Sequence, residues 1–321
     1  MSLILPPPRP TTVFPVLARG ETVPDALRGA VVAIGNFDGV HRGHKHVVEA
    51  ARGAAAREGR PVVVMTFEPH PRSYFQPDVP LFRLSDAAAK VRLLAGLGID
   101  ALAVLPFDRT LAETSADAFE TGLLVEWLGA AVVVVGRDFH YGARRGGNAE
   151  TLRKAGLAKG FGVVQVEALD SDAGTISSSA IRHALAAGDL DAANGQLGHS
   201  WFVSATVIHG EKRGRTLGYP TANLRLDPAC SPRHGIYAVK VGLDGRWLDG
   251  VASFGRRPTF DNGAPLLEVH VFDLNESLYD RELDIVFAGY IRGEAKFDSL
   301  EALIAQMDQD SRDARNILNR G

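Results

Sequence analysis

The chain has 321 residues, 45% of them hydrophobic, so it is long enough to bury two separate cores, and two domains are expected. Its formal net charge is −3 and its lysines and arginines form no long blocks, which argues against nonspecific nucleic-acid binding as the main role. The single cysteine, Cys230, excludes an intrachain disulfide and a thiolate metal site.

The start of the chain, Met1 to Pro10, is rich in proline and is expected to be mobile. It has neither the charged region nor the long apolar stretch of an export signal. No run of about 18 apolar residues occurs anywhere, so a membrane-spanning helix is not expected. These features predict a cytoplasmic chain whose partners are small molecules rather than nucleic acid or membrane, and they leave the oligomeric state open.

Five short apolar runs between residues 31 and 166 predict strands, and helical patterns separate them. Because the runs are continuously apolar rather than alternating, we expect parallel strands with helices on both faces, that is, an α/β doubly wound sheet. Ligands bind such sheets beyond the carboxyl ends of the strands, near a topological switch point. The strands are expected at 31–34, 62–67, 101–105, 132–135 and 163–166, and the helices at 43–57, 85–95, 115–128 and 148–159.

A glycine-rich run, residues 35–44, follows the first strand directly and opens the first helix. Such a turn presents unpaired N–H groups and the positive end of a helix dipole, which attract phosphate. His41 and His44 add N–H donors, and Gly43 lets a nucleotide approach the backbone closely. Ordinary turn residues, or a metal site with His46, are the alternatives, although a metal site would leave the flanking glycines unexplained. The predicted nucleotide-binding residues of this turn are Gly35, Asn36, Phe37, Asp38, Gly39 and Gly43.

Ser177, Ser178 and Ser179 stand where a helix expected over 177–187 begins, with Arg182 in its first turns. Their hydroxyls either cap free N–H groups or bind phosphate oxygens, and the planar guanidinium suits the same oxygens. A purely structural serine cap is the alternative.

Two further strings lie at the same edge of the predicted sheet. Asp138 and Phe139 follow the fourth strand, and the Phe139 ring suits stacking on a planar ligand, although a core role is equally open. Residues 66–71, Thr-Phe-Glu-Pro-His-Pro, end the second strand, where His70 is either a ligand contact or a solvated residue of a proline-stiffened exit.

The turn 35–44 and the serine–arginine element resemble the His-x-Gly-His and Ile-Ser-Ser-Ser/Thr-x-Ile-Arg motifs of the nucleotidylyltransferase superfamily. The longer turn resembles its flavin branch, bacterial FMN adenylyltransferase. The resemblance implies adenylyl transfer from ATP to FMN, giving FAD and pyrophosphate, with the two histidines stabilising charge on the transferring group and Arg182 near the far phosphates. His140 and Asn148 stand where the family commonly has arginine and aspartate, so the departures concern the flavin contacts and leave the ATP elements intact.

After Ile176 the pattern changes to two helices, at 177–187 and 189–197, and then to short alternating stretches separated by glycine and proline turns. Six such strands predict a small antiparallel β-barrel, and a final helix over 299–318 is expected to pack on it. We therefore predict domains at 1–187 and 200–321, joined by a helical linker at 188–199. The barrel strands are expected at 202–209, 221–226, 236–243, 247–254, 266–272 and 283–287.

The stretch 210–223 opens the barrel domain with a glycine-rich loop. This loop is not a P-loop, because that motif needs four residues between its glycines and a lysine before the hydroxyl residue. The residues that follow the loop, 217–223, resemble the Pro-Thr-Ala-Asn element of riboflavin kinases, whose domain is a six-stranded barrel. The alternative is a strand that begins after a proline turn, which would not explain all of the residues in this motif. The resemblance implies Gly210, Gly214, Gly218 and Pro220 near ATP, and Thr221 and Asn223 as neutral oxygen ligands of Mg²⁺.

Glu268 lies among apolar residues of an expected strand, where a carboxylate is costly without a partner or a task. By the same resemblance it is the general base that takes the proton of the ribityl 5′-hydroxyl of riboflavin as this oxygen attacks the γ-phosphate of ATP. An exposed barrel edge is the alternative. Arg292 is assigned to the flavin end on the same grounds, and a surface ion pair is its alternative.

With motifs in both halves of the chain, in the order in which the family has them, the chain resembles the bacterial bifunctional riboflavin kinases and FAD synthetases. The chain is expected to make FMN in its carboxyl domain and FAD in its amino domain, with ATP and Mg²⁺ in each step. Ser253-Phe254 and Asp280 replace the Asn-Ile and the glycine common in the family. The Ser253-Phe254 and Asn148 departures leave open an adenylyltransferase whose barrel has lost kinase activity or serves another acceptor. A binding protein whose barrel recognises RNA or protein is a further alternative, against which the chain lacks a basic patch interleaved with aromatics.

Overall fold

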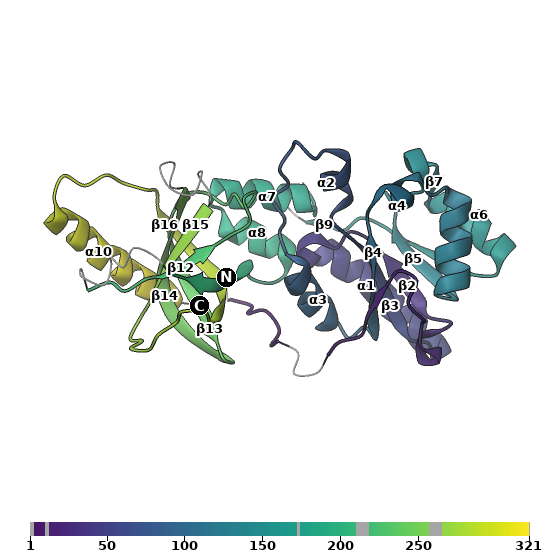
Figure 1. Cartoon of the computed structure of the whole chain (residues 1–321), viewed down its shortest axis with the longest axis horizontal. Helices are drawn as coiled ribbons and strands as arrows, with labels where there is room; N and C mark the ends of the chain where they lie inside the picture. Colours follow the sequence, from purple (N-terminus) through teal and green to yellow (C-terminus); the bar gives the residue numbers. More distant parts are fainter. Residues whose placement is uncertain (1–2, 10–12, 172–173, 210–217, 257–264, 321) are drawn as a thin grey trace. The chain divides into compact units, whose positions relative to one another are not determined.

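The computed structural model describes residues 3–9, 13–171, 174–209, 218–256 and 265–320 and divides into two units (Figure 1). The sheet unit comprises Arg9–Leu81 and Asp86–Ser177, and the barrel unit comprises Met1–Pro8, Phe82–Ser85 and Ser178–Gly321. Within the described residues, no helix combines the length and apolar character needed to cross a membrane.

Six parallel strands form the sheet, in the order β1-β4-β3-β2-β5-β8. The chain builds outward from β2 to β3 and β4 and then returns to add β5 and β8 on the other side of β2. The topological switch point therefore lies at the carboxyl end of β2, where the histidine turn leaves the sheet. The strands are β1 (Val16–Ala18), β2 (Val31–Ile34), β3 (Val62–Glu68), β4 (Ala101–Pro106), β5 (Val132–Gly136) and β8 (Gly162–Val166).

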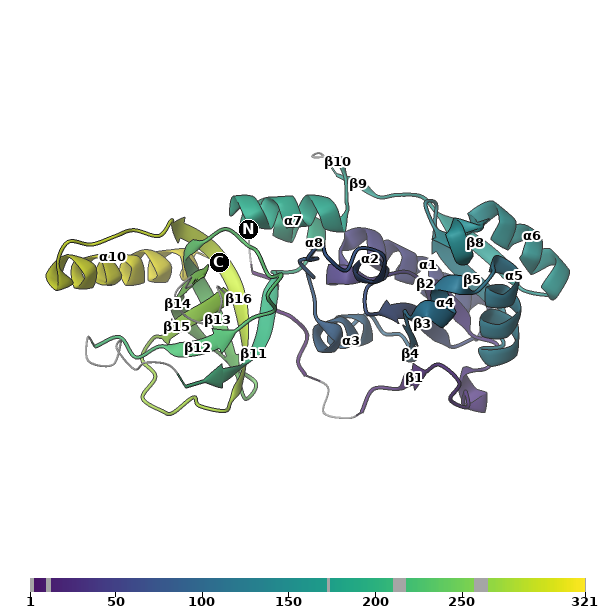
Figure 2. The same ribbon diagram turned by 45° about the horizontal axis from the view of Figure 1, so that its top comes forward.

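Helices cover both faces of this sheet (Figure 2). Helix α1 packs on β2, β3, β5 and β8, whereas alternate strand residues such as Val32 and Val133 share a core on the other face with Phe119 and Leu152. The predicted doubly wound sheet is confirmed. The helices and turns of this unit are η1 (Asp25–Leu27), η2 (Asp38–Val40), α1 (Arg42–Glu58), α2 (Pro71–Phe75), α3 (Ala87–Ala95), α4 (Arg109–Glu113), α5 (Ala116–Ala118), the π-helical η3 (Phe119–Trp127), η4 (Ala143–Arg145) and α6 (Ala149–Lys159); β6 (His140–Tyr141) pairs with β7 (Gly147–Asn148), and β9 (Asp170–Ser171) with β10 (Gly174–Thr175).

The second half forms a closed antiparallel barrel in the order β11-β12-β15-β14-β13-β16, and helix α10 packs on β13, β14 and β16. The alternating strands bury one face each: Leu267, Val269 and Val271 point into the core. The predicted six-stranded barrel with a carboxyl-terminal helix is confirmed. Its elements are α7 (Ser178–Ala187), α8 (Leu190–Leu197), β11 (Phe202–Ile208), β12 (Ala222–Arg225), β13 (Gly235–Leu243), β14 (Arg246–Arg256), β15 (Pro265–Val271), β16 (Glu282–Arg292) and α10 (Leu300–Leu318).

The core of the barrel unit also contains residues from outside the barrel. Ile181 of α7 is fully buried in it, and Phe82 is 6% exposed, with its ring edge to face against the ring of Trp201 at 5.7 Å between centroids. The Trp201 indole Nε1–H donates to the Leu84 carbonyl at 3.1 Å. A segment from the amino-terminal half of the chain is thus part of the barrel core, while the domain bounds 1–187, 188–199 and 200–321 stay a prediction.

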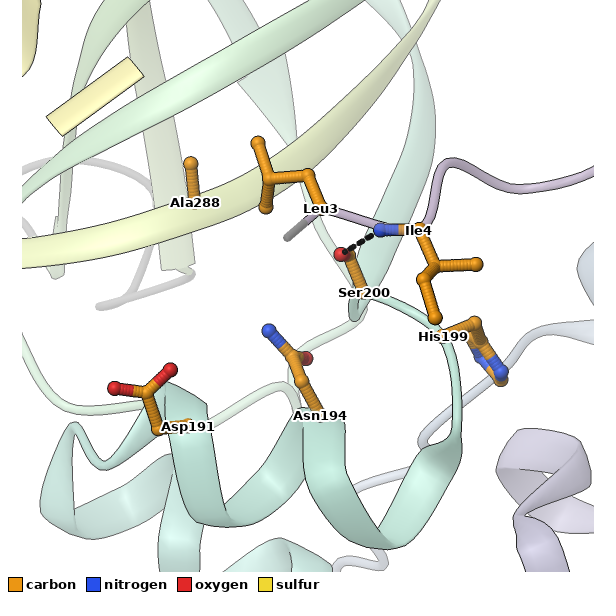
Figure 3. Close-up of a pocket in the computed structure, with 7 residues that line it drawn as sticks. All are labelled: Leu3, Ile4, Asp191, Asn194, His199, Ser200 and Ala288. Carbon is orange, nitrogen blue, oxygen red and sulfur yellow. Dashed lines mark hydrogen bonds between the residues drawn. The ribbon is translucent and has the colours of Figure 1, made fainter. Parts of the chain in front are cut away.

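The proline-rich start of the chain lies on the barrel unit. Ile4 donates its N–H to the Ser200 hydroxyl at 3.1 Å and accepts the Ser200 N–H at 2.9 Å (Figure 3). At Ile4 these contacts do not fit the predicted mobile start, while residues 1, 2 and 10 lie outside the described part of the chain. Leu3, Ile4, Asn194 and His199 line a pocket of about 10 Å³, the space of one water-sized sphere, so this pocket is no substrate site.

We expect Phe82→Ala to lower the free energy of unfolding of the barrel unit by about 3–5 kcal/mol, because it leaves a cavity against Trp201 in a closed core. Urea unfolding followed by circular dichroism measures this change. Leu157→Ala, at a side chain that is 79% exposed, is the matched control. A change as small as that of the control would contradict a role of the segment Phe82–Ser85 in the barrel core.

Candidate functional site

The turn between β2 and α1 has a constrained backbone. Phe37 and Val40 adopt left-handed conformations with φ of 49° and 42°, and Gly39 between them has φ of 77°. A β-branched valine rarely adopts this region, and such strain is concentrated at functional sites. The turn is tied to β3 because the Thr66 hydroxyl donates to the Asn36 carbonyl at 3.1 Å.

His41 and His44 form a stacked pair at the start of α1. Their ring centroids lie 3.6 Å apart with an interplanar angle of 15°. His41 is the N-cap of the helix, where its Nδ1 accepts the His44 backbone N–H at 3.3 Å. Because Nδ1 is the acceptor, neutral His41 carries its proton on Nε2, which makes this atom a donor.

The His44 ring lies beside Phe37, 5.1 Å between centroids, and its Nδ1 is buried without a hydrogen-bond partner among the described residues. Burial lowers the pKa of His44 well below its usual value, and the charges of His41, Lys90 and His70 lower it further. His44 is therefore neutral above its usual pKa of about 6.5. We assign its proton to Nε2, since an N–H on Nδ1 would have no acceptor.

Gly43 provides the space that this pair needs. A Cβ at this position would lie 3.2 Å from both Cε1 and Nδ1 of His41, closer than most real Cβ contacts. The absence of a side chain at Gly43 thus leaves room for the His41 ring. The sequence did not reveal this close approach of the ring to the backbone.

The other predicted residues of the sheet unit have local partners. Phe139 stacks on Tyr141 with centroids 5.5 Å apart and packs on the edge of the core, while Asp138 is exposed. His70 caps α2, since its Nδ1 accepts the Arg72 N–H at 3.1 Å. Asn148, a departure from the family pattern, caps α6 with a side-chain oxygen that accepts two backbone N–H groups.

Helix α7 begins at Ser178, so the division between the units falls within the serine cluster. Ser177 belongs to the sheet unit, whereas Arg182 belongs to the barrel unit, where its Nε donates to the Phe82 carbonyl at 2.5 Å. Joint action of Arg182 with the two histidines stays a prediction.

In the barrel unit, three predicted or noted residues meet on one face. Asn223 of β12 pairs with Glu268 of β15, and Glu268 pairs with Ser253 of β14. Directly opposite residues in paired strands share a face of the sheet. Asn223 is only 8% exposed although its neighbours Ala222 and Leu224 point into the barrel core. An amide oxygen next to a carboxylate is a donor set that suits Mg²⁺.

The remaining predicted residues of the barrel unit lie near this face or beyond the described chain. Thr221 directly precedes β12, Gly218 is exposed with φ of 81°, and the Pro220 carbonyl lies 2.9 Å from Nδ1 of His270. Gly210 and Gly214 lie outside the described residues. Within the described part of the chain, no three histidine, cysteine or acidic side chains are grouped to hold a metal.

Arg292 ends β16 and forms a bidentate ion pair with Asp310 of α10. Its Nε and a terminal nitrogen donate to the two carboxylate oxygens at 2.8 and 2.6 Å. Asp310 is 4% exposed and also accepts from Gln306. Arg292 therefore forms the ion pair of the alternative, with a buried carboxylate and a partly exposed guanidinium, and contact of Arg292 with flavin stays a prediction.

Two family models match the chain, one described as FAD synthetase at residues 23–180 and one as riboflavin kinase at residues 197–318. The bifunctional riboflavin kinase/FMN adenylyltransferase of Escherichia coli K12 is 41% identical over 89% of this chain and 92% of its own length. The Haemophilus influenzae protein of the same name is 41% identical over 91% and 96%. A crystal structure described as a macrolide-efflux protein from Streptococcus pneumoniae has a TM-score of 0.85 and 31% identity, and the match covers 94% of this chain and 99% of that one.

Proposed function

This chain belongs to the family of bifunctional riboflavin kinases and FMN adenylyltransferases, and on that premise we propose that its two reactions occur at separate sites, one in each unit. It phosphorylates riboflavin to FMN and adenylylates FMN to FAD with release of pyrophosphate, and both steps use ATP and Mg²⁺. The observation that carries the two-site proposal is that the His41–His44 pair belongs to the sheet unit and the Asn223–Glu268 pair to the barrel unit. A cytoplasmic location is part of the proposal, because both reactions consume ATP and the lone Cys230 is a free thiol.

Adenylyl transfer is proposed at the turn after β2. His41 and His44 offer Nε2–H donors to the phosphates, and the amino end of α1 adds its dipole. The fixed donors stabilise the charge on the transferring phosphorus group, so no protein nucleophile is needed. By family resemblance, Ser177 serves the far phosphates, and Asp138 and Phe139 serve the flavin.

Riboflavin phosphorylation is proposed on the outer face of the barrel. Glu268 acts as the base that accepts the ribityl hydroxyl proton, and Thr221 and Asn223 hold the Mg²⁺ that accompanies ATP. Mg²⁺ neutralises charge on the phosphates. Ser253 stands where the family commonly has asparagine, and it lies opposite Glu268 on the neighbouring strand. Because serine is neutral, it leaves Glu268 able to act as the base.

Incubation of the purified chain with riboflavin, ATP and Mg²⁺, followed by chromatographic separation of the flavins, tests both steps at once. We expect FMN to appear first and FAD to follow. FMN that accumulates without FAD would contradict the site after β2, and absence of turnover from riboflavin, with FAD still formed from supplied FMN, would contradict the site on the barrel.

We expect Gly43→Ala to slow FAD formation from FMN about ten- to hundredfold, because the added methyl group displaces the His41 ring. Riboflavin phosphorylation by the same preparation should be unchanged. Gly53→Ala, on the same helix with nothing within 4 Å of the new Cβ, is the matched control. Equal rates for the two variants would show that the ring position is not critical.

A further inference from the structure

A side chain, rather than the sheet, ties down the short segment that leads into β12. The ladder between β12 and β15 begins at the pair Ala222 and Val269. Pro220, two residues earlier, has no N–H to donate, so only its carbonyl can tie the backbone at this point. This carbonyl lies 2.9 Å from Nδ1 of His270, a residue of β15. The segment is therefore joined to β15 by a side-chain hydrogen bond before the ladder starts.

The hydrogen bond also fixes where His270 carries a proton. A carbonyl oxygen can only accept, so Nδ1 of His270 is protonated and donates. The ring has two aromatic neighbours, Tyr219 with centroids 5.0 Å apart and Phe272 with centroids 5.8 Å apart. Tyr219 in turn donates its hydroxyl to Asp308 of α10. Strand β15 and helix α10 thus hold the same segment.

His270 lies on the face of the barrel that carries the proposed kinase site. Val269 is buried in the barrel core, so its neighbours Glu268 and His270 lie together on the other face of β15. Asn223 pairs with Glu268, and the same register continued by two residues sets Thr221 opposite His270. The anchored carbonyl belongs to the residue directly before Thr221. The anchor therefore acts on the backbone next to a proposed Mg²⁺ ligand.

We propose that His270 is a positioning residue for riboflavin phosphorylation that holds the Pro220 carbonyl, and with it Thr221, in place to bind Mg²⁺. The proposal rests on the Mg²⁺ role of Thr221 and Asn223 in the proposed function. The His270 bond fixes the backbone on one side of Thr221, and the β12 ladder fixes it on the other. Residues that orient a metal ligand typically contribute about 10–100-fold to metal affinity or activity. The ligand oxygen is thus oriented before the metal and ATP arrive.

The test compares His270→Phe with His270→Asn in the full chain. Phenylalanine keeps an aromatic ring beside Tyr219 and Phe272 but has no N–H donor. Asparagine loses the ring, but its amide nitrogen is as many bonds from the backbone as Nδ1 and can donate to the same carbonyl. His234→Phe, at a histidine of the same unit whose ring lies against Phe254, is the matched control.

The measurements are nitrogen NMR of the His270 ring, KM for Mg·ATP and kcat in riboflavin phosphorylation, and FAD formation from supplied FMN. In the wild type we expect the NMR spectrum to place a proton on Nδ1. His270→Phe should raise KM for Mg·ATP about 10–100-fold, with kcat within about threefold of wild type because Glu268 is unchanged. His270→Asn should keep KM near the wild-type value, and FAD formation should be unchanged in each variant.

Three results would overturn the proposal. They are an Nδ1 without a proton, an unchanged KM for Mg·ATP in His270→Phe, and an equal loss in His270→Phe and His270→Asn, which would reduce the ring to a packing role. The proposed function fails in a different way. A wild-type chain that forms no FMN would refute the kinase site itself, and Thr221→Ala with an unchanged KM for Mg·ATP would refute the Mg²⁺ role on which the inference rests.

Discussion

Glu268→Gln will stop FMN formation while FAD formation from supplied FMN continues at the wild-type rate. Glutamine keeps the shape of the side chain and its place between Asn223 and Ser253, but it cannot accept the proton of the ribityl hydroxyl. Loss of a general base lowers rates by about 10²–10⁴-fold. The change removes a charge at one site in the barrel unit and alters nothing in the sheet unit.

Single-turnover phosphorylation of riboflavin, with FMN separated by chromatography, measures this loss. Glu276→Gln removes a carboxylate that pairs with Arg246 at the surface of the same unit, and it should leave both reactions unchanged. Phosphorylation that stays within about threefold of wild type in Glu268→Gln falls short of the loss expected of a base and would exclude Glu268 from that role.

Much of the fold could be predicted because its signals are local. The continuous valine runs of the sheet and the alternating strands of the barrel each bury the face that their pattern indicates. The edge strand Val16–Ala18 escaped prediction, since three residues are too few to show a period. Strand β16 continues to Arg292, past its predicted end at residue 287. The predicted end falls where the pairing of β16 with β13 shifts register, between Ala238 and Val239 of β13.

The candidate site could be predicted only where its residues are close in sequence. His41 and His44 are three apart, and the N-cap geometry brings their rings together. The pairing of Asn223 with Glu268 depends on strand register, and the hydrogen bond from His270 to the Pro220 carbonyl joins residues that are 50 positions apart. Long-range contacts of this kind become visible only when the fold is known.

His41→Ala is expected to reverse the selectivity of Glu268→Gln, with FAD formation lost and FMN formation retained. The change removes an Nε2–H donor at the phosphates, a loss of about 10²–10³-fold in rate for one fixed donor to a transition state. It also removes the N-cap of α1 and the stacking partner of His44, at about 1 kcal/mol of stability for the cap. The kinetic effect should therefore far exceed what the lost cap explains.

His41→Asn separates the two roles, because asparagine is a good N-cap but has no imidazole donor. We expect this variant to regain the thermal stability lost in His41→Ala without regaining FAD formation, as measured by melting curves and by conversion of supplied FMN. His46→Ala, at an exposed position on the same helix, should leave both reactions unchanged, whereas a metal site built from the three histidines would lose activity in all three variants. If His41→Ala keeps its fold but loses both reactions equally, the two sites are not independent.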